Sequence, residues 1–406
     1  MKLNKIEKLI AELCPDGVDY ITIYEIIDYV QPSKYIVKST KYDNSYTTPV
    51  LTAGKSFLLG YTNEIDGVFE ASKENPVMIF DDFTTSMHWV DFYFKVKSSA
   101  LKILTLKDNS QNFRYLYYAL KSLDYSVSNG THERHWISKY SQQDIPLPPL
   151  EIQNEIVRIL DNFTELEAEL EAELEARTMQ YEYYRNKLLD FSMGYVGVPK
   201  IDEMLTDMCP KGVKYIKFGS FSKILRGASP RPIKNFVTND ANGVNWIKIG
   251  DTSPKDKYIT KTAEKITIEG AEKSRRVYPG DFVLSNSMSF GRPYILKIEG
   301  CIHDGWLSIS DYQKFLSPDY LYHLLTSSIV QNQFDTGANQ GTVRNLNADI
   351  VKNILLPVPP LEIQNQIVKI LDKFSEYTTS ITEGLPAEIE ARRKQYEYYR
   401  NKLLTF

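Results

Sequence analysis

A nine-residue segment occurs twice in this chain, and this duplication constrains its fold more than any other feature. YEYYRNKLL occupies Tyr181–Leu189 and returns at Tyr396–Leu404. The match continues upstream, because PPLEIQNEIVRILDNF is repeated as PPLEIQNQIVKILDKF and LCPDGVDYI as MCPKGVKYI. Between these landmarks, residues 22–143 and 217–354 show no comparable match. The chain is therefore organised as variable block, shared segment, variable block, shared segment.

The composition indicates a water-soluble globular protein of two or three domains. Its 406 residues are 42% hydrophobic, which is enough to bury a core in each domain. The N-terminal segment alternates charged and apolar residues, unlike a secretory signal, and no apolar run approaches the length of a membrane span. We expect a cytoplasmic protein with no membrane contact. The three cysteines, at positions 14, 209 and 301, predict neither a disulfide framework nor a zinc ribbon.

The shared segments predict long helices. After each Pro-Pro pair, isoleucine and leucine recur at the three-to-four spacing of one helical face, and in the first copy three tandem ELEA units follow. Ala, Glu and Leu are strong helix formers, so a helix from about Glu151 to about Asp190 would be about 60 Å long. The second copy is four residues longer and contains Gly384 and Pro386, which predict a break or kink.

The variable blocks mix short β-rich runs with helical runs, and each block has about the size of one compact domain. For example, VDFYFKVKS at residues 90–98 predicts a strand, and SPDYLYHLLTSSIVQNQF at residues 317–334 predicts a single helix. Their charge differs, since residues 215–356 carry 18 Lys and Arg against 13 Asp and Glu, whereas residues 20–144 carry 13 against 14. The formal net charge of −4 therefore conceals one basic domain.

The predicted fold class is mixed α/β (α+β): two domains joined by two long antiparallel helices that form a coiled-coil-like spacer with approximate two-fold symmetry. Antiparallel pairing is expected because it buries the apolar stripes of two similar helices against each other. The predicted parts are a first domain with an N-terminal helix, a central shared helix, a second domain and a C-terminal shared helix, at residues 1–147, 148–195, 196–358 and 359–406.

The doubled Pro-Pro-Leu-Glu-x-Gln helix with its ELEA repeat, set around two dissimilar domains, resembles the specificity (S) subunits of type I restriction-modification systems. The resemblance covers essentially the whole chain. It implies that each variable block is a target recognition domain for one half of a bipartite site in double-stranded DNA, and that the helices dock two methyltransferase (M) subunits. In that family the M subunits bind S-adenosylmethionine and methylate adenine at N6. Two restriction (R) subunits, where a cognate one exists, use ATP and Mg for cleavage, so this chain itself needs no cofactor and no metal.

A physical argument leads to the same target. A symmetric DNA-binding dimer reads two identical half-sites, so a fused pseudo-dimer whose two readers have diverged should read two different half-sites at a fixed separation. The duplication is therefore consistent with an asymmetric bipartite target.

Catalysis by the chain itself is the rival hypothesis, and the sequence lacks its motifs. An amino-methyltransferase of this kind needs an Asx-Pro-Pro-aromatic loop, but the Pro-Pro pairs here lie only in LPPLE and VPPLE, and no GxxxxGK[ST] phosphate loop is present. We interpret the carboxylate pair Asp81-Asp82 as a strand-end turn, and His132 with His135 as DNA contacts or a packed loop rather than a metal site. A second alternative is a non-catalytic scaffold that binds another ligand through two domains on a helical rod. It predicts salt-insensitive binding, whereas DNA binding weakens steeply with salt.

Polar loops that carry Arg, Asn or Gln are the candidate DNA contacts, because these side chains are the usual readers of guanine and adenine. In the second domain the loops RGASPRPIKN, SNSMSFGR and GANQGTVRN supply Arg226, Arg231, Lys234, Asn286, Ser287, Arg292, Asn339, Gln340 and Arg344. In the first domain the candidates are Lys34, Lys55, His88, His132, Arg134 and His135. For any one of them a phosphate contact or no contact is commoner than base readout. The candidate M-binding residues lie in the tail copies, at Tyr181, Tyr184, Arg185, Tyr396, Tyr399 and Arg400.

Overall fold

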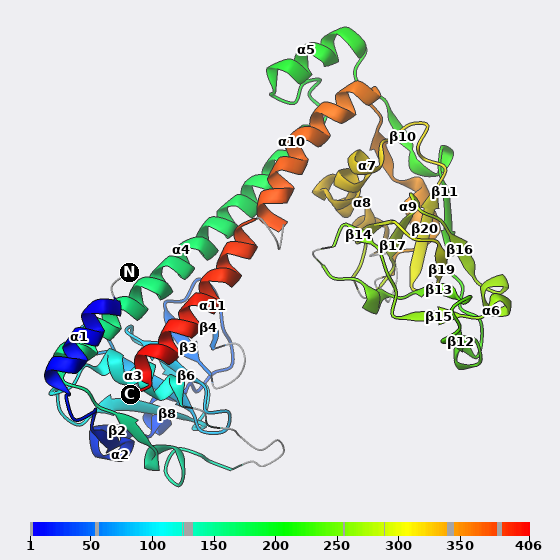
Figure 1. Cartoon of the computed structure of the whole chain (residues 1–406). Helices are drawn as coiled ribbons and strands as arrows, with labels where there is room; N and C mark the ends of the chain where they lie inside the picture. The colour runs from blue at the N-terminus through cyan, green and yellow to red at the C-terminus, as the bar shows by residue number, and fades with distance from the viewer. Residues whose placement is uncertain are drawn as a thin grey trace. The chain divides into compact units, whose positions relative to one another are not determined.

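The computed structural model describes residues 3–52, 57–123, 125, 133–254, 256–287, 289–338, 345–379 and 384–406 (Figure 1). The chain folds as two compact units. Unit 1 comprises Met1–Glu169 and Glu390–Phe406, and unit 2 comprises Leu170–Ile389. Each unit combines a mixed α/β domain with parts of the long helices. Within the described residues, no helix is both long and apolar enough to cross a membrane.

Unit 1 is built around a four-stranded antiparallel sheet of order β2-β8-β5-β6. A three-stranded sheet places β3 between antiparallel β4 and parallel β7, and β1 pairs with β9. The elements up to the central helix are α1 (Leu3–Leu13), β1 (Tyr20–Thr22), α2 (Ile23–Ile26), β2 (Ile27–Val30), η1 (Pro32–Tyr35), β3 (Thr48–Leu51), β4 (Leu58–Thr62), β5 (Val77–Asp81), β6 (Met87–Val90), β7 (Lys95–Val96), β8 (Leu101–Leu106), α3 (Phe113–Ser122), η2 (Tyr140–Gln142) and β9 (Asp144–Pro146).

The central sheet of unit 1 lies between two cores, because successive side chains of a strand point to opposite faces. Met78 and Phe80 of β5 pack with α3 and the start of the central helix. Val77 and Ile79, from the same strand, pack with the three-stranded sheet. The sheet is therefore covered on both faces.

Unit 2 contains two five-stranded sheets, of order β11-β20-β17-β18-β14 and β12-β15-β13-β19-β16, and a two-stranded sheet of β10 and β21. Its elements are α5 (Pro199–Met208), β10 (Tyr215–Lys217), η3 (Phe218–Ser220), β11 (Lys223–Arg226), η4 (Ile233–Asn235), β12 (Val237–Thr238), β13 (Val244–Ile247), η5 (Ile249–Asp251), β14 (Tyr258–Ile259), β15 (Glu264–Ile266), α6 (Ile268–Glu272), β16 (Arg275–Val277), β17 (Phe282–Ser285), β18 (Pro293–Leu296), β19 (Gly300–Ile302), β20 (Trp306–Ser310), α7 (Pro318–Thr326), α8 (Ser328–Ala338), α9 (Ala348–Asn353), β21 (Leu355–Pro357) and α10 (Leu361–Thr379).

The strand order of unit 2 repeats that of unit 1, although the sequences of the variable blocks show no match comparable to that of the shared segments. The antiparallel series β11-β20-β17-β18 corresponds to β2-β8-β5-β6, and the parallel pair β13–β19 corresponds to β3–β7. The two-stranded sheets share their register, with Tyr20 opposite Pro146 and Tyr215 opposite Pro357. The duplication therefore includes the variable domains, whose topology has been retained while their side chains diverged.

The central helix α4 (Leu150–Leu189) is continuous, as predicted, and begins in unit 1 and ends in unit 2. In unit 1 it lies beside α11 (Leu385–Leu404), drawn in red in Figure 1, where the rings of Phe163 and Tyr399 stack at 5.5 Å and Glu167 pairs with Arg393. The contacts advance along α4 from Phe163 to Glu167 while they go back along α11 from Tyr399 to Arg393, so the two helices are antiparallel.

In unit 2, α4 packs on α10, and the ring of Tyr184 stacks on that of Phe374 at 5.4 Å. Arg177 and Tyr377 line one cavity further along, so this pair is also antiparallel. Each YEYYRNKLL copy thus packs beside the Pro-Pro-led helix of the other repeat.

The second shared segment forms two helices, α10 and α11, in agreement with the predicted break at Gly384 and Pro386. Residues 380–383 lie outside the described part of the chain. The predicted helix at 317–334 is wrong in one respect. It is divided into α7 and α8 at Ser327, whose backbone is extended and whose buried hydroxyl donates to the carbonyl of Leu324 at 2.7 Å.

The predicted strand at residues 90–98 is also largely wrong, because within it only Val90, which ends β6, and Lys95–Val96, which form β7, are in strands. Phe94 makes only an isolated bridge with Phe69. A strand requires a partner along its length, and β7 pairs with β3 at just two residues, with one isolated bridge from Val96 to Ile36 on its other side.

Candidate nucleic-acid interface

One edge of the larger sheet in unit 2 collects segments that are distant in sequence. Strand β20 lies between β11 and β17 and is antiparallel to both, so it begins where they end. Arg226, the last residue of β11, faces Leu307, and Ser285, the last residue of β17, faces Trp306. The predicted loops RGASPRPIKN and SNSMSFGR therefore meet there, together with the segment 303–305 that precedes β20.

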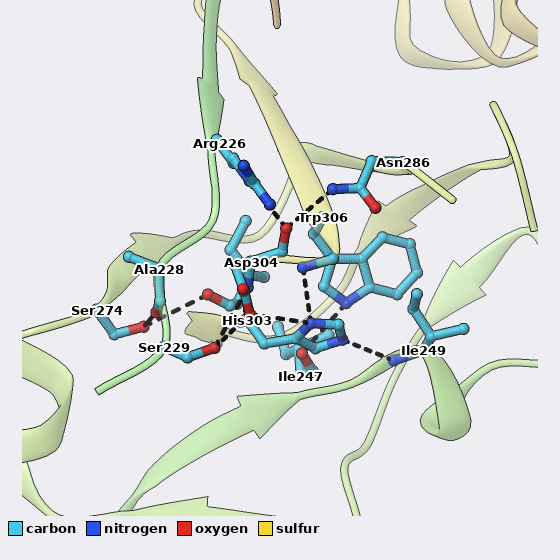
Figure 2. Close-up of polar contacts among 12 residues, drawn as sticks. Arg226, Ala228, Ser229, Ile247, Ile249, Ser274, Asn286, His303, Asp304 and Trp306 are labelled. Atoms are coloured by element: carbon cyan, nitrogen blue, oxygen red, sulfur yellow. Dashed lines mark hydrogen bonds and ion pairs between the residues drawn. The ribbon is translucent and has the colours of Figure 1, made fainter. Parts of the chain in front are cut away.

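Asp304 is the centre of the contacts at this edge (Figure 2). Its backbone carbonyl accepts hydrogen bonds from Arg226 Nε at 3.1 Å and from Asn286 Nδ2 at 2.9 Å. Its carboxylate accepts a hydrogen bond from the Ser229 hydroxyl at 2.7 Å and forms an ion pair with Arg231 at 3.5 Å. One residue thus joins two of the three predicted loops, and the sequence analysis did not identify it.

The backbone around Asp304 is fixed by close packing. A Cβ atom on Gly227 would lie 2.0 Å from the carbonyl oxygen of His303, so the chains can approach this closely only with glycine. The N–H of Gly305 donates to Nδ1 of His303 at 2.8 Å, and the N–H of Ile249 faces Nε2 at 3.3 Å. Trp306 is fully buried and donates from Nε1 to the carbonyl of Ile247 at 3.2 Å. Asp304 therefore stands on a rigid support.

The edge presents positive charge around the carboxylate of Asp304. The Arg231 side chain is 82% exposed, that of Asp304 is 42% exposed, and Arg226, Lys234 and Ser287 are also exposed. The hydrogen bond from Ser229 lowers the pKa of Asp304, so this carboxyl is ionised at neutral pH. Burial lowers the pKa of His303, so its ring is neutral there. The arrangement can recognise a partner by charge-assisted hydrogen bonds.

The side chains at this edge offer recognition chemistry. Across the described ranges, no group of three His, Cys, Asp or Glu side chains could hold a metal ion. Guanidinium donors and one carboxylate acceptor are the groups that hydrogen-bond base edges and phosphates.

The remaining candidates in unit 2 are buried at this edge, lie elsewhere or lie outside the described residues. Asn286 is buried and engaged with Asp304, Gly305 and Leu346 of its own domain. Arg292 lines a cavity of about 320 Å³ that Arg185 and Tyr181 also line, and its buried Nη1 has no hydrogen-bond partner among the residues that the structure describes. The predicted candidates in the third loop, Asn339, Gln340 and Arg344, lie outside the described residues.

The equivalent edge of unit 1 carries some of the first-domain candidates. Asp82 corresponds to Asn286, because the two residues make the same pair of backbone hydrogen bonds. The N–H of Asp82 donates to the carbonyl of Ala100, and its carbonyl accepts from the N–H of His135. The N–H of Asn286 donates to the carbonyl of Gly305, and its carbonyl accepts from the N–H of Leu346. Lys34 lies in η1, soon after β2, and is exposed, as is Arg134.

The remaining first-domain candidates serve their own fold to a large extent. His135 is 3% exposed and its Nδ1 lies 3.0 Å from the hydroxyl of Tyr125. His88 is half-buried in β6 and stacks on Phe57 at 3.9 Å. Among the described residues no hydrogen bond or ion pair joins Lys34, His88 and Arg134. Lys55 and His132 lie outside the described part.

The predicted strand-end turn at Asp81-Asp82 is confirmed. Asp81 ends β5, and its carboxylate accepts hydrogen bonds from the N–H of Phe83 at 2.9 Å and the hydroxyl of Thr84 at 2.6 Å. Asp82 is buried and pairs with the equally buried Lys102 at 3.5 Å. Both carboxylates are thus used structurally.

The candidate M-binding residues of the two tails occupy matching environments. Tyr181 is buried with its hydroxyl 3.1 Å from Nδ1 of His323, and Tyr396 packs beside the first-domain core. Tyr184 and Tyr399 make the ring stacks described above, and the guanidinium groups of Arg185 and Arg400 lie 5.1 and 5.8 Å from the centres of the Tyr181 and Tyr396 rings. The exposed tyrosines of the two copies are Tyr183 and Tyr398, at 60% and 61%. The repeat itself contains the signal for this pair, because both occupy the same position in YEYYRNKLL.

Comparison with known proteins places the chain in a defined class. The family model described as the type I restriction modification DNA specificity domain matches residues 15–176 and 210–391, one match for each repeat. The chain is therefore a double DNA-specificity domain.

Similarity over the full length of the chain identifies the protein family more precisely. The chain is 40% identical to the Escherichia coli type I restriction enzyme EcoR124I/EcoR124II specificity subunit, over 100% of this chain and 98% of that protein. It belongs to the specificity subunits of type I restriction-modification systems.

Solved structures share the fold at low sequence identity. The type I restriction-modification S subunit of M. genitalium matches with a TM-score of 0.54 and 14% identity, covering 96% of this chain and 97% of that one. A chain from work on complex assembly and conformational transition of the type I R-M system matches with a TM-score of 0.61 and 15% identity, covering 96% and 98%.

Proposed function

We propose that the two recognition domains of this specificity subunit read different half-sites of one asymmetric bipartite DNA target. The observation that carries this proposal is the repeated strand order with different side chains at the equivalent sheet edge, around Asn286 and Asp304 in unit 2 and around Asp82 in unit 1. A shared scaffold with divergent edge residues suits two readers of different sequences. Arg226, Arg231 and Lys234 are the proposed DNA contacts of unit 2, and Lys34 and Arg134 those of unit 1.

We further propose that the chain is a recognition subunit without a catalytic centre of its own. Methyl transfer from S-adenosylmethionine to adenine N6 is assigned to two M subunits, and cleavage that depends on ATP and Mg to R subunits. Two copies of one tail, with matching ring stacks and matching exposed tyrosines at 183 and 398, support docking of the same partner twice. The candidate M-binding residues support these docking surfaces through their packing; they are Tyr181, Tyr184, Arg185, Tyr396, Tyr399 and Arg400.

The test is co-expression of the chain with its methyltransferase subunit, followed by mapping of methylated adenines in the host DNA. We expect one motif made of two unlike half-sites at a fixed separation. Binding of the purified complex to that motif should weaken steeply as salt rises, because contacts with phosphates release counterions. A continuous or palindromic methylated motif would contradict the proposal, and so would salt-independent binding.

A further inference from the structure

We propose that Asp304 is a specificity-determining residue of the second recognition domain, which acts by orienting the guanidinium of Arg231 toward the base that Arg231 reads. This inference rests on the proposed function of the sheet edge. It adds a residue that lies outside the loops predicted from sequence, and it assigns that residue a role in base choice.

The position of the carboxylate is unusual for a surface that binds a polyanion. Asp304 is partly exposed between Arg226 and Arg231, where a negative charge opposes DNA phosphates. One carboxylate oxygen accepts the hydrogen bond from Ser229 at 2.7 Å, which leaves the second oxygen facing Arg231 at 3.5 Å. The hydrogen bond from Ser229 therefore fixes the direction from which Arg231 is held.

Stability does not account for this contact. An ion pair with an 82% exposed arginine contributes little to folding, since solvent screens it and both side chains lose freedom. Orientation matters far more, because a guanidinium recognises guanine through two parallel hydrogen bonds in a fixed plane. An arginine anchored from one side is better prepared for that geometry than a free one.

The other domain provides an internal comparison. Asp82 donates to the carbonyl of Ala100 as Asn286 donates to that of Gly305, so Ala100 corresponds to Gly305. The residue before Ala100, Ser99, therefore occupies in unit 1 the position that Asp304 has in unit 2. The same backbone position thus carries a hydroxyl in one reader and a carboxylate in the other. A difference in charge at one position of an edge whose backbone arrangement is shared is the kind of change that gives two half-sites different sequences.

The test uses the full chain assembled with its methyltransferase subunits. In the variant Asp304→Asn, we expect the preference for the correct base over the other three, at one position of the second half-site, to fall about tenfold. The first half-site should be unchanged, and affinity for random-sequence DNA should be equal or higher because one negative charge is gone. The control Asp207→Asn removes the same charge from an exposed position of α5 in the same unit and should leave base preference unchanged.

A double-mutant cycle tests the route through Arg231. If Asp304 acts by orienting Arg231, then Asp304→Asn should cause no further loss of base preference in an Arg231→Gln background. Additive losses would overturn the inference, as would an unchanged base preference in Asp304→Asn. Parallel loss of specific and random-sequence affinity together with a lowered Tm would overturn it as well, because that pattern indicates a structural role. If the wild-type complex shows no sequence preference at all, it is the proposed function that fails.

Discussion

Replacing Gln364 with methionine should selectively destabilise unit 2. This side chain is fully buried at the start of α10, where Oε1 accepts a hydrogen bond from the N–H of Ser317 at 2.9 Å, and Nε2 donates to the carbonyls of Phe315 and Pro359, both at 2.8 Å. Methionine keeps the length of the side chain and removes all three bonds. Each of the three buried backbone groups left without a partner costs about 1–3 kcal/mol. The burial of one more apolar side chain offsets the sum of these costs by about 1–2 kcal/mol.

The expected net loss in the free energy of unfolding is about 3 kcal/mol, which for a unit of this size lowers Tm on the order of 10 °C. Scanning calorimetry of the full chain measures it. The matched control is Gln366→Met, two residues further along α10 at a partly exposed position, which should shift Tm by less than about 2 °C. Gln153→Met should act on unit 1 instead, because Gln153 accepts from the N–H of Asn112 at 2.9 Å in the same way. A Tm for Gln364→Met equal to that of the control would refute the reasoning.

Four further predictions address function and pH. Deleting Glu169–Ala172 shortens α4 by about 6 Å and rotates the C-terminal part of this helix by about 40° relative to its N-terminal part. Since one base pair corresponds to about 3.4 Å and about 34°, the mapped methylated motif should keep both half-sites and lose about one base pair of separation; an unchanged separation would contradict this. Exchanging residues 22–143 for a foreign recognition domain should change one half-site only, which mapping of methylated adenines checks. The purified chain alone should bind DNA weakly and transfer no methyl group from labelled S-adenosylmethionine, whereas transfer would place a catalytic centre in it. His323 faces Tyr181 and Asp372, and Lys257 and Arg185 lie nearby. Burial lowers the pKa of His323 in the folded state, so the unfolded state binds more protons as the pH falls. Unit 2 should therefore lose stability below about pH 6.5, the ordinary pKa of histidine. Chemical denaturation at pH 7.5 and 5.5 should show this loss, and it should be smaller in His323→Tyr.

The tyrosine in that last variant comes from the internal repeat. Tyr118 of α3 contacts Asp161 of α4 in unit 1, as His323 of α7 contacts Asp372 of α10 in unit 2. These two pairs occupy the same place in the two units, although the side chains differ. The segment Tyr115–Tyr117 before the one residue and Tyr320–Tyr322 before the other have the same sequence, YLY, whereas the two contact residues have changed chemistry while keeping their contact.

The sequence by itself determined the duplication, the helical nature of both shared segments, the break in the second and the class of protein. These features depend on local patterns, such as nine identical residues, apolar spacing along a helix, and Gly384 with Pro386. It also nominated three loops of the second domain, those of Arg226, Asn286 and Asn339, as candidate contacts, since each combines turn residues with polar side chains.

Only the tertiary structure decided which of these loops meet and what holds them together. Strand order arises from pairing between distant segments, and no local pattern shows that β20 lies between β11 and β17. Asp304 was therefore missed, because in sequence it is one acid in a short turn. Pairing also decided one of the two wrong assignments, because β7 meets its partner β3 at only two residues. The other, the helix break at Ser327, is held by a local hydrogen bond to the carbonyl of Leu324 in the preceding turn. Local propensity fixes what a segment prefers, whereas long-range contacts select which preference is realised and which side chains become neighbours.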